Sequence, residues 1–173
     1  MLRLLLLRHA KSDRPAGVAD LDRPLNPRGR KAAPLMAAYL AEQELRPDLA
    51  LVSPARRTRE TWEPVGQAIG QARVELVDGI YEAPASALLA VIRDASDARS
   101  LMLVGHNPGL QNLAIRLAGA GSREDRARLR TQFPTAALAV IDFEADAWRE
   151  IGWGGGRLER FLGPRDIARG SDD

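Results

Sequence analysis

The chain has 173 residues, of which 45% are hydrophobic and 28% charged, a balance typical of folded globular proteins that excludes global disorder. Its formal net charge of +2 is close to neutral, and the absence of cysteine excludes disulfides, thiolate nucleophiles and cysteine-bound metals. The length predicts a single domain over residues 1–173, with a loosely ordered tail from about residue 164.

The first half of the chain alternates short apolar runs with longer helical patterns. We expect strands at 2–7, 48–52 and 73–77, because each is a short apolar or alternating run. Between them, the spacing of the apolar residues predicts helices within 27–45 and at 54–69.

The second half continues the alternation. We expect a helix at 86–95, a fully buried strand at 100–104 and a helix at 108–119. The mixed charges of 120–132 predict a solvated helix for which Ser122 is the cap. Residues 137–143 and 148–153 then predict a terminal hairpin.

This order of elements predicts an α/β domain with a mainly parallel central sheet and helices on both faces. Asn26-Pro27, Ser53-Pro54 and Asn107-Pro108 each place a capping residue before a proline, a common helix start. The last two pairs follow strands. Their helices should therefore begin at the carboxyl edge of the sheet, where open α/β folds bind ligands and exposed amides favour anions.

The only two histidines, His9 and His106, both end apolar strand-like runs. Arg8 precedes the first, and Arg56, Arg57 and Arg59 follow the second predicted strand. If these side chains meet at one sheet edge, they form a positively charged pocket whose donors match a phosphoryl group.

Four segments resemble one family. Arg8-His9-Ala10 resembles the Arg-His-Gly signature of the histidine phosphatase superfamily, and SPARRTRET (53–61) resembles its Ser-x-x-x-Arg-x-x-x-Thr motif, with the arginine at Arg57. VGHNPGL (104–110) and DLDRPLNPRG (20–29) are similar to motifs of the SixA-like phosphohistidine phosphatase branch. The resemblance spans about residues 2–143 in order, although Ala10 replaces the usual glycine and Asn26 a common threonine.

The resemblance implies a three-layer, phosphoglycerate mutase-like fold and a phosphatase that needs no cofactor or metal. His9 would be the nucleophile that carries the phosphoryl group, while Arg8, Arg57 and His106 would hold its oxygens. The implied substrate is phosphohistidine or another phosphoramidate, with small phosphoesters as the alternative. Because attack needs a neutral imidazole, we expect activity to fall on acidification.

The general acid is open between two carboxylates, Asp20 and Glu82. Asp20 matches an aspartate of the SixA-like branch, and Glu82 follows the third predicted strand. Lys11 and Ser12 follow His9 on a loop and are further candidates for contacts with the phosphate.

Three other functions compete with this interpretation. A metal hydrolase could use both histidines with Asp20 or Asp22, but the neighbouring arginines would repel a cation. Nucleotide-binding motifs of the P-loop and dinucleotide types are absent. A non-catalytic module that binds a phosphorylated ligand is the third.

The expected partner is a phosphorylated substrate, for which a phosphohistidine-bearing protein is one candidate. Glu124 and Asp125 interrupt the basic stretch around 123–130, which argues against nucleic acid. The leading apolar run is too short for a signal peptide, and no run could span a membrane, so we expect a cytoplasmic protein without a membrane partner. The sequence predicts no particular oligomeric state.

Overall fold

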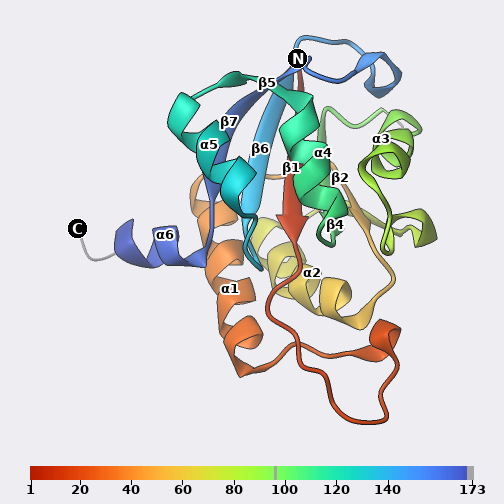
Figure 1. The fold of residues 1–173 in the computed structure, drawn as a ribbon, viewed down its shortest axis with the longest axis vertical. Coiled ribbons are helices and arrows are strands. Elements are labelled where there is room, and N and C mark those ends of the chain that lie inside the picture. The colour runs from red at the N-terminus through yellow and green to blue at the C-terminus, as the bar shows by residue number, and fades with distance from the viewer. Residues whose placement is uncertain (96, 171–173) are drawn as a thin grey trace.

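A mixed sheet forms the centre of the computed structural model, which describes residues 1–95 and 97–170 (Figure 1). Within those residues the sheet has seven strands in the order β3-β2-β4-β1-β6-β7-β5. The strands are β1 (Leu2–Arg8), β2 (Leu49–Val52), β3 (Arg73–Leu76), β4 (Ser100–Gly105), β5 (Ala118–Gly121), β6 (Leu138–Phe143) and β7 (Gly156–Leu162). Only the pairings of β6 with β1 and with β7 are antiparallel.

Helices cover both faces of the sheet, which confirms the predicted α/β fold. The helices are α1 (Pro27–Glu42), α2 (Arg56–Ile69), α3 (Ala85–Arg93), α4 (Gly109–Leu117), α5 (Arg123–Thr131) and α6 (Pro164–Gly170). Short 3-10 helices occupy Asp20–Asp22, Asp78–Ile80 and Trp148–Glu150. None of the helices in the described ranges combines the length and apolarity needed to cross a bilayer.

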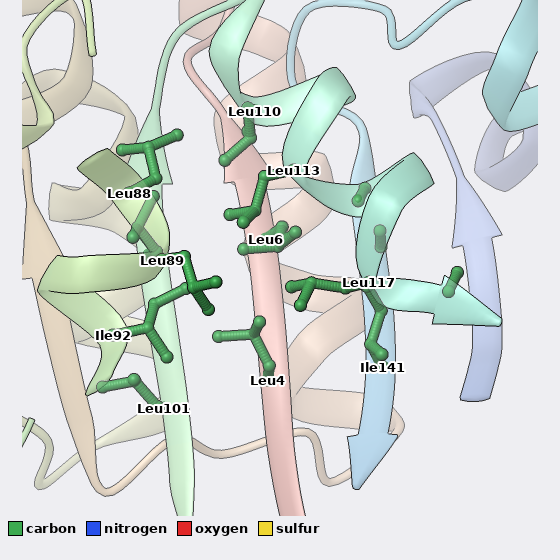
Figure 2. Packing of buried hydrophobic residues seen from close by; sticks show 14 of the residues in the cluster. Leu4, Leu6, Leu88, Leu89, Ile92, Leu101, Leu110, Leu113, Leu117 and Ile141 are labelled. Carbon is green, nitrogen blue, oxygen red and sulfur yellow. The ribbon is translucent and has the colours of Figure 1, made fainter. Parts of the chain in front are cut away.

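The leucine run at the start of the chain serves both faces because successive strand residues point to opposite sides of a sheet. Leu4 and Leu6 belong to the core cluster under α3 and α4, where Figure 2 shows them facing Leu89 and Leu113. Leu5 and Leu7 belong to the cluster under α1 and α2. All four are fully buried, and each contributes about 1.5–3 kcal/mol to stability. β1 is therefore anchored from both sides, which holds the residues that follow it in place.

The predicted strand at 148–153 is wrong. Trp148 begins a 3-10 turn and donates from its indole N–H to the carbonyl of Ala98, shortly before β4, at 2.6 Å. Its burial therefore comes from packing against this segment and not from a strand. The strand that pairs with β6 is β7, within the glycine- and arginine-rich stretch that follows. An alternating pattern of buried residues does not distinguish a strand from a tightly packed turn.

Two further segments near the C-terminal end differ from expectation. The predicted helix at 108–119 ends at Leu117, and Ala118–Gly121 pair with β7 as strand β5. Gly119 approaches the backbone so closely that a Cβ would lie 2.1 Å from the Gly154 oxygen. The tail from 164 is ordered as α6 through Gly170, where Asp166 pairs with Arg128 at 2.9 Å. Residues 171–173 of that predicted loose tail lie outside the described residues.

The helix caps were predicted with mixed success. Asn26 caps α1 by accepting a hydrogen bond from the Gly29 amide at 2.9 Å, and Ser122 caps α5 by accepting from the Asp125 amide at 3.2 Å. Ser53 does not cap α2, which begins at Arg56. Asn107 lies one residue before the cap position of α4, yet its Oδ1 accepts from the Gln111 amide in the first turn at 3.2 Å, as a capping side chain does. Its side-chain amide also donates to the Phe133 carbonyl at 3.1 Å.

Candidate active site

Two neighbouring parallel strands bring the two histidines together. β1 and β4 pair in a register that places Arg8 opposite Gly105, and each strand is followed at once by a histidine. The rings of His9 and His106 consequently lie 5.4 Å apart between centroids, with their planes tilted by 53°. Both side chains are buried. Residues almost a hundred positions apart in sequence thus share one site at the carboxyl edge of the sheet.

His9 is held as a neutral imidazole with one nitrogen available. Its Nδ1 lies 2.8 Å from the Ala10 carbonyl, which can only accept, so Nδ1 carries the proton and Nε2 keeps its lone pair. Burial lowers the pKa of His9 to about 3, against the raising effect of that hydrogen bond, and the neighbouring His106, Arg8 and Arg57 lower it further. The unprotonated Nε2 is therefore the form present at neutral pH.

His106 is oriented by a serine. Its Nε2 lies 2.7 Å from Ser53 Oγ, which also accepts from the Ala55 amide at 3.4 Å. Its Nδ1 is buried and has no hydrogen-bond partner in the described residues. Burial and then Arg57 lower the pKa of His106 to about 4. If Ser53 donates its hydroxyl proton to Nε2, the neutral ring carries its proton on Nδ1 and presents a donor to the site.

Two arginines supply further donors. Arg8 donates from Nη1 to the Phe133 carbonyl at 2.8 Å, and Arg57 donates from Nη1 to the Asp20 carbonyl at 2.8 Å. The Nε atoms of both are buried and unpaired among the described residues. Buried unpaired N–H groups are rare in proteins and call for a partner. Both guanidinium groups lie near enough to His9 to lower its pKa, so the site is positively charged and suited to an oxyanion.

Asp20 closes one side of the site in its ionised form. Its carboxylate accepts from the Tyr81 hydroxyl, from Arg23 at 2.8 Å and from Arg57 at 3.1 Å. These bonds, with that of Tyr81 foremost and that of Arg23 next, hold the pKa of Asp20 well below its ordinary value. In this arrangement Asp20 has no proton to donate at neutral pH, which does not fit its predicted role as a general acid.

The other predicted site residues are Glu82, Ser12 and Lys11, and each has a different environment. Glu82 is exposed and makes no side-chain hydrogen bond or ion pair with any described residue. Ser12 accepts from Arg23 at 2.6 Å and so braces the loop that carries Asp20. Lys11 is exposed and lines a separate groove. The structure therefore gathers His9, His106, Arg8 and Arg57, with Asp20 beside them.

Sequence reasoning missed Tyr81 and the partner of His106. Besides binding Asp20, Tyr81 places its ring edge-on to His106, 5.5 Å between centroids. Its position directly before Glu82, in the turn after the third strand, could have indicated that Tyr81 belongs to the site. Ser53 was interpreted only as a helix cap. Across the ranges that the structure describes, no group of three or more histidine, aspartate and glutamate side chains could hold a metal.

Fold and site together define an α/β protein with two buried histidines and two arginines at one edge of the sheet. Residues 4–88 match the family model described as histidine phosphatase superfamily, branch 1. An uncharacterized Mycobacterium leprae protein is 33% identical, over 92% of this chain and 100% of its own length. The chain belongs to the histidine phosphatase superfamily.

Solved structures agree with this assignment. A protein from Agrobacterium tumefaciens assigned as a phosphohistidine phosphatase, SixA, is 34% identical with a TM-score of 0.79, covering 94% of this chain and 98% of its own. One from Nakamurella multipartitia with the same assignment is 28% identical with a TM-score of 0.83, covering 94% and 96%. Both support a hydrolase of the phosphatase type.

Proposed function

We propose that this protein is a phosphohistidine or phosphoramidate phosphatase that works through a covalent intermediate on His9. The observation that carries the proposal is the geometry around His9. The neutral ring of His9, with a free Nε2, lies 5.4 Å from the ring of His106 between centroids. Arg8 and Arg57, whose buried Nε atoms lack partners within the described chain, lie close enough to lower the pKa of His9. A non-catalytic module has no need of a nucleophile kept unprotonated in this way.

In the first step, the Nε2 lone pair of His9 attacks phosphorus. The leaving imidazole first takes a proton from solution on its other ring nitrogen. A new N–P bond then forms to His9 while the P–N bond to that imidazole breaks, and the leaving nitrogen keeps the electron pair, so a neutral imidazole departs. Nδ1 of His9 keeps its proton and continues to donate it in a hydrogen bond to the Ala10 carbonyl. The intermediate is therefore a phosphoimidazolium. The N–H groups of Arg8, Arg57 and His106 stabilise the negative charge on the equatorial oxygens.

In the second step, a water molecule attacks the phosphorus of the intermediate. The P–Nε2 bond breaks and its electron pair returns to His9, which restores the neutral imidazole. The products are inorganic phosphate and a proton released to solution. No change in the protonation of Asp20 or Glu82 is needed in either step.

The state of Asp20 favours a nitrogen leaving group. An alkoxide must receive a proton from a strong acid as it leaves, whereas an imidazole can be protonated before the P–N bond breaks. Tyr81, Arg23 and Arg57 hold Asp20 ionised. The similar proteins assigned as SixA phosphohistidine phosphatases point to the same substrate class. For a cytoplasmic protein, we propose that this substrate is a phosphoprotein that carries the phosphohistidine.

A substrate panel with a variant of the nucleophile tests the proposal. Wild type, His9→Ala and the distant surface control Arg73→Ala are compared on a phosphohistidine peptide, phosphoramidate, an aryl phosphate and an alkyl phosphate. We expect His9→Ala to lose at least about a thousandfold in kcat/KM on every substrate that wild type hydrolyses, with Arg73→Ala unchanged. Wild type should prefer the P–N substrates.

Trapping the intermediate supplies a second readout. Protein mixed with labelled phosphoramidate and quenched in alkali should carry label on wild type and none on His9→Ala. His106→Ala should still accept label, because it keeps the nucleophile, but more slowly. Equal turnover by wild type and His9→Ala, or label on His9→Ala, would refute the assignment of the nucleophile.

A further inference from the structure

A groove of about 790 Å³ lies beside the catalytic site, lined by residues of α1, of the 131–135 segment and of α6. Figure 1 shows α6 next to α1 at the side of the molecule, with α5 beyond it. The volume falls in the range of ligand-binding clefts in proteins. Nothing in the proposed chemistry uses this groove.

The rim of the groove is strongly basic. Five exposed cations line it: Lys11, Arg28, Lys31, Arg165 and Arg169. None of the five makes an ion pair or a side-chain hydrogen bond within residues 1–95 and 97–170. In a chain with a net charge of only +2, this concentration of free positive charge on one surface is uneven.

The one lining carboxylate does not offset that charge. Asp166 accepts from Arg128 at 2.9 Å and from the Gly163 amide at 2.7 Å, so its charge is already compensated. The rest of the lining is uncharged and mostly apolar, with Leu35 and Pro134 partly accessible and Phe161 buried. Its polar members are Thr131, Gln132 and Thr135. A basic rim over an apolar floor fits a polypeptide that carries both acidic and apolar side chains.

The groove is joined to the catalytic site through shared backbone. Lys11 lies two residues after His9. On the opposite side, Pro134 follows Phe133, whose carbonyl accepts from Arg8 at 2.8 Å, and the Ala136 amide donates to the His9 carbonyl at 3.0 Å. A protein that presents a phosphoryl group to His9 therefore brings its neighbouring surface over the groove.

We propose that this basic groove binds an acidic segment of a phosphoprotein substrate, next to the phosphorylated residue. The proposal rests on the phosphatase function above and adds how its protein substrate is chosen. Complementary charge of this kind speeds association and rejects partners of the wrong sign. Nucleic acid fits less well, because the aromatic ring of the floor, Phe161, is buried and offers no stacking surface.

Direct binding tests the groove independently of catalysis. The probe is a short fluorescein-labelled peptide, unphosphorylated and rich in glutamate and leucine. The groove variant is Lys31→Glu/Arg165→Glu/Arg169→Glu, and the control is Arg73→Glu/Arg99→Glu/Arg149→Glu, which makes the same change of charge at exposed positions outside the groove. We expect the groove variant to bind about tenfold more weakly, with a smaller salt dependence, and the control to bind like wild type.

Turnover tests the link to substrate choice. Two phosphohistidine peptides are compared that differ only in flanking glutamates or flanking glutamines. Wild type and the control should prefer the acidic peptide by about tenfold in kcat/KM, and the groove variant should lose that preference. The ratio of the two peptides is independent of any general change in activity.

The outcomes separate the two proposals. Groove-dependent peptide binding without turnover of any phosphohistidine would refute the phosphatase proposal and support the groove as an acidic-peptide site. Turnover with no preference for acidic flanks, and equal binding by all three proteins, would overturn the groove. Displacement of the peptide by a single-stranded oligonucleotide at a lower concentration than by unlabelled peptide would also overturn it, in favour of nucleic acid.

Discussion

Asp20 lies on Arg57 as a substrate anion would, with a carboxylate oxygen 3.1 Å from Nη2. Its backbone carbonyl accepts from Nη1 of the same guanidinium at 2.8 Å. The Tyr81 hydroxyl and Arg23 hold the carboxylate in that position. A negative charge of the protein itself therefore lies against the arginine that we assign to the phosphoryl group.

Removing this charge should strengthen anion binding. We expect Asp20→Asn to bind inorganic phosphate about three- to tenfold more tightly at pH 7, because a neutral amide no longer repels it. The inhibition constant of phosphate against phosphoramidate hydrolysis measures the effect. Asp22→Asn, on the same exposed turn, is the control for a change in net charge. Weaker phosphate inhibition of Asp20→Asn would mean that Asp20 chiefly positions Arg57.

The tautomer of His106 should depend on Ser53. Ser53→Ala removes the only side-chain partner of Nε2 in the described structure, so the proton would be shared between the ring nitrogens. We expect kcat/KM to fall about five- to twentyfold, because in the proposed mechanism His106 acts on the phosphoryl oxygens as a donor through Nδ1–H. Ser86→Ala, on the exposed face of α3, is the control.

Nitrogen NMR separates this effect from simple loss of stability. Two-bond correlations of the imidazole rings should assign the proton of His106 to Nδ1 in wild type and to a mixture of both nitrogens in Ser53→Ala. An unchanged tautomer with reduced activity would contradict the positioning role of Ser53.

Both histidines should remain neutral far below their ordinary pKa. Burial lowers the pKa of His9 to about 3 and that of His106 to about 4. The chain has two histidines, so in untagged protein every imidazole signal belongs to the site. We expect no titration of their ring protons between pH 8 and pH 5, and kcat/KM limited by His9 protonation only below about pH 4. Titration of either ring near pH 6.5 would contradict this.

The same pKa values predict how stability depends on pH. The unfolded chain binds protons at the histidines as the pH falls through about 6.5, whereas the folded chain does so only near 4 and 3. The free energy of unfolding should therefore fall below pH 6.5, by about 1.4 kcal/mol per pH unit for each histidine. Urea denaturation at pH 7, 6 and 5 measures the slope. In His9→Asn/His106→Asn the decline should be shallower by the contribution of both groups.

Gly29 should resist a substitution that normally stabilises helices. A Cβ at this position would lie 2.1 Å from the carbonyl oxygen of Lys11, which follows His9 by two residues. We expect Gly29→Ala to destabilise the protein by several kcal/mol, although alanine is about 1 kcal/mol better than glycine in a helix. Gly170→Ala is the matched control, because a Cβ there meets nothing within 4 Å. Urea denaturation should show the two variants changing in opposite directions.

The sequence by itself determined the type of fold and the residues that meet at the sheet edge. Four consecutive leucines predict a strand buried on both faces, and Leu4 to Leu7 divide between the two cores as that pattern requires. Asn26 predicts its helix start because a cap acts within one turn of the chain. These features depend on local periodicity and local hydrogen bonds.

Only the tertiary structure decided which partners these residues have. Ser53 bonds to His106 instead of capping a helix, Tyr81 and Asp20 meet across sixty-one positions, and β7 instead of 148–153 pairs with β6. The groove beside the site likewise depends on α6 packing against α1. The physical reason is that the residue type alone fixes how many hydrogen bonds a side chain can donate and accept. Which group becomes its partner depends on strand order and helix packing. Those depend on contacts between segments far apart along the chain.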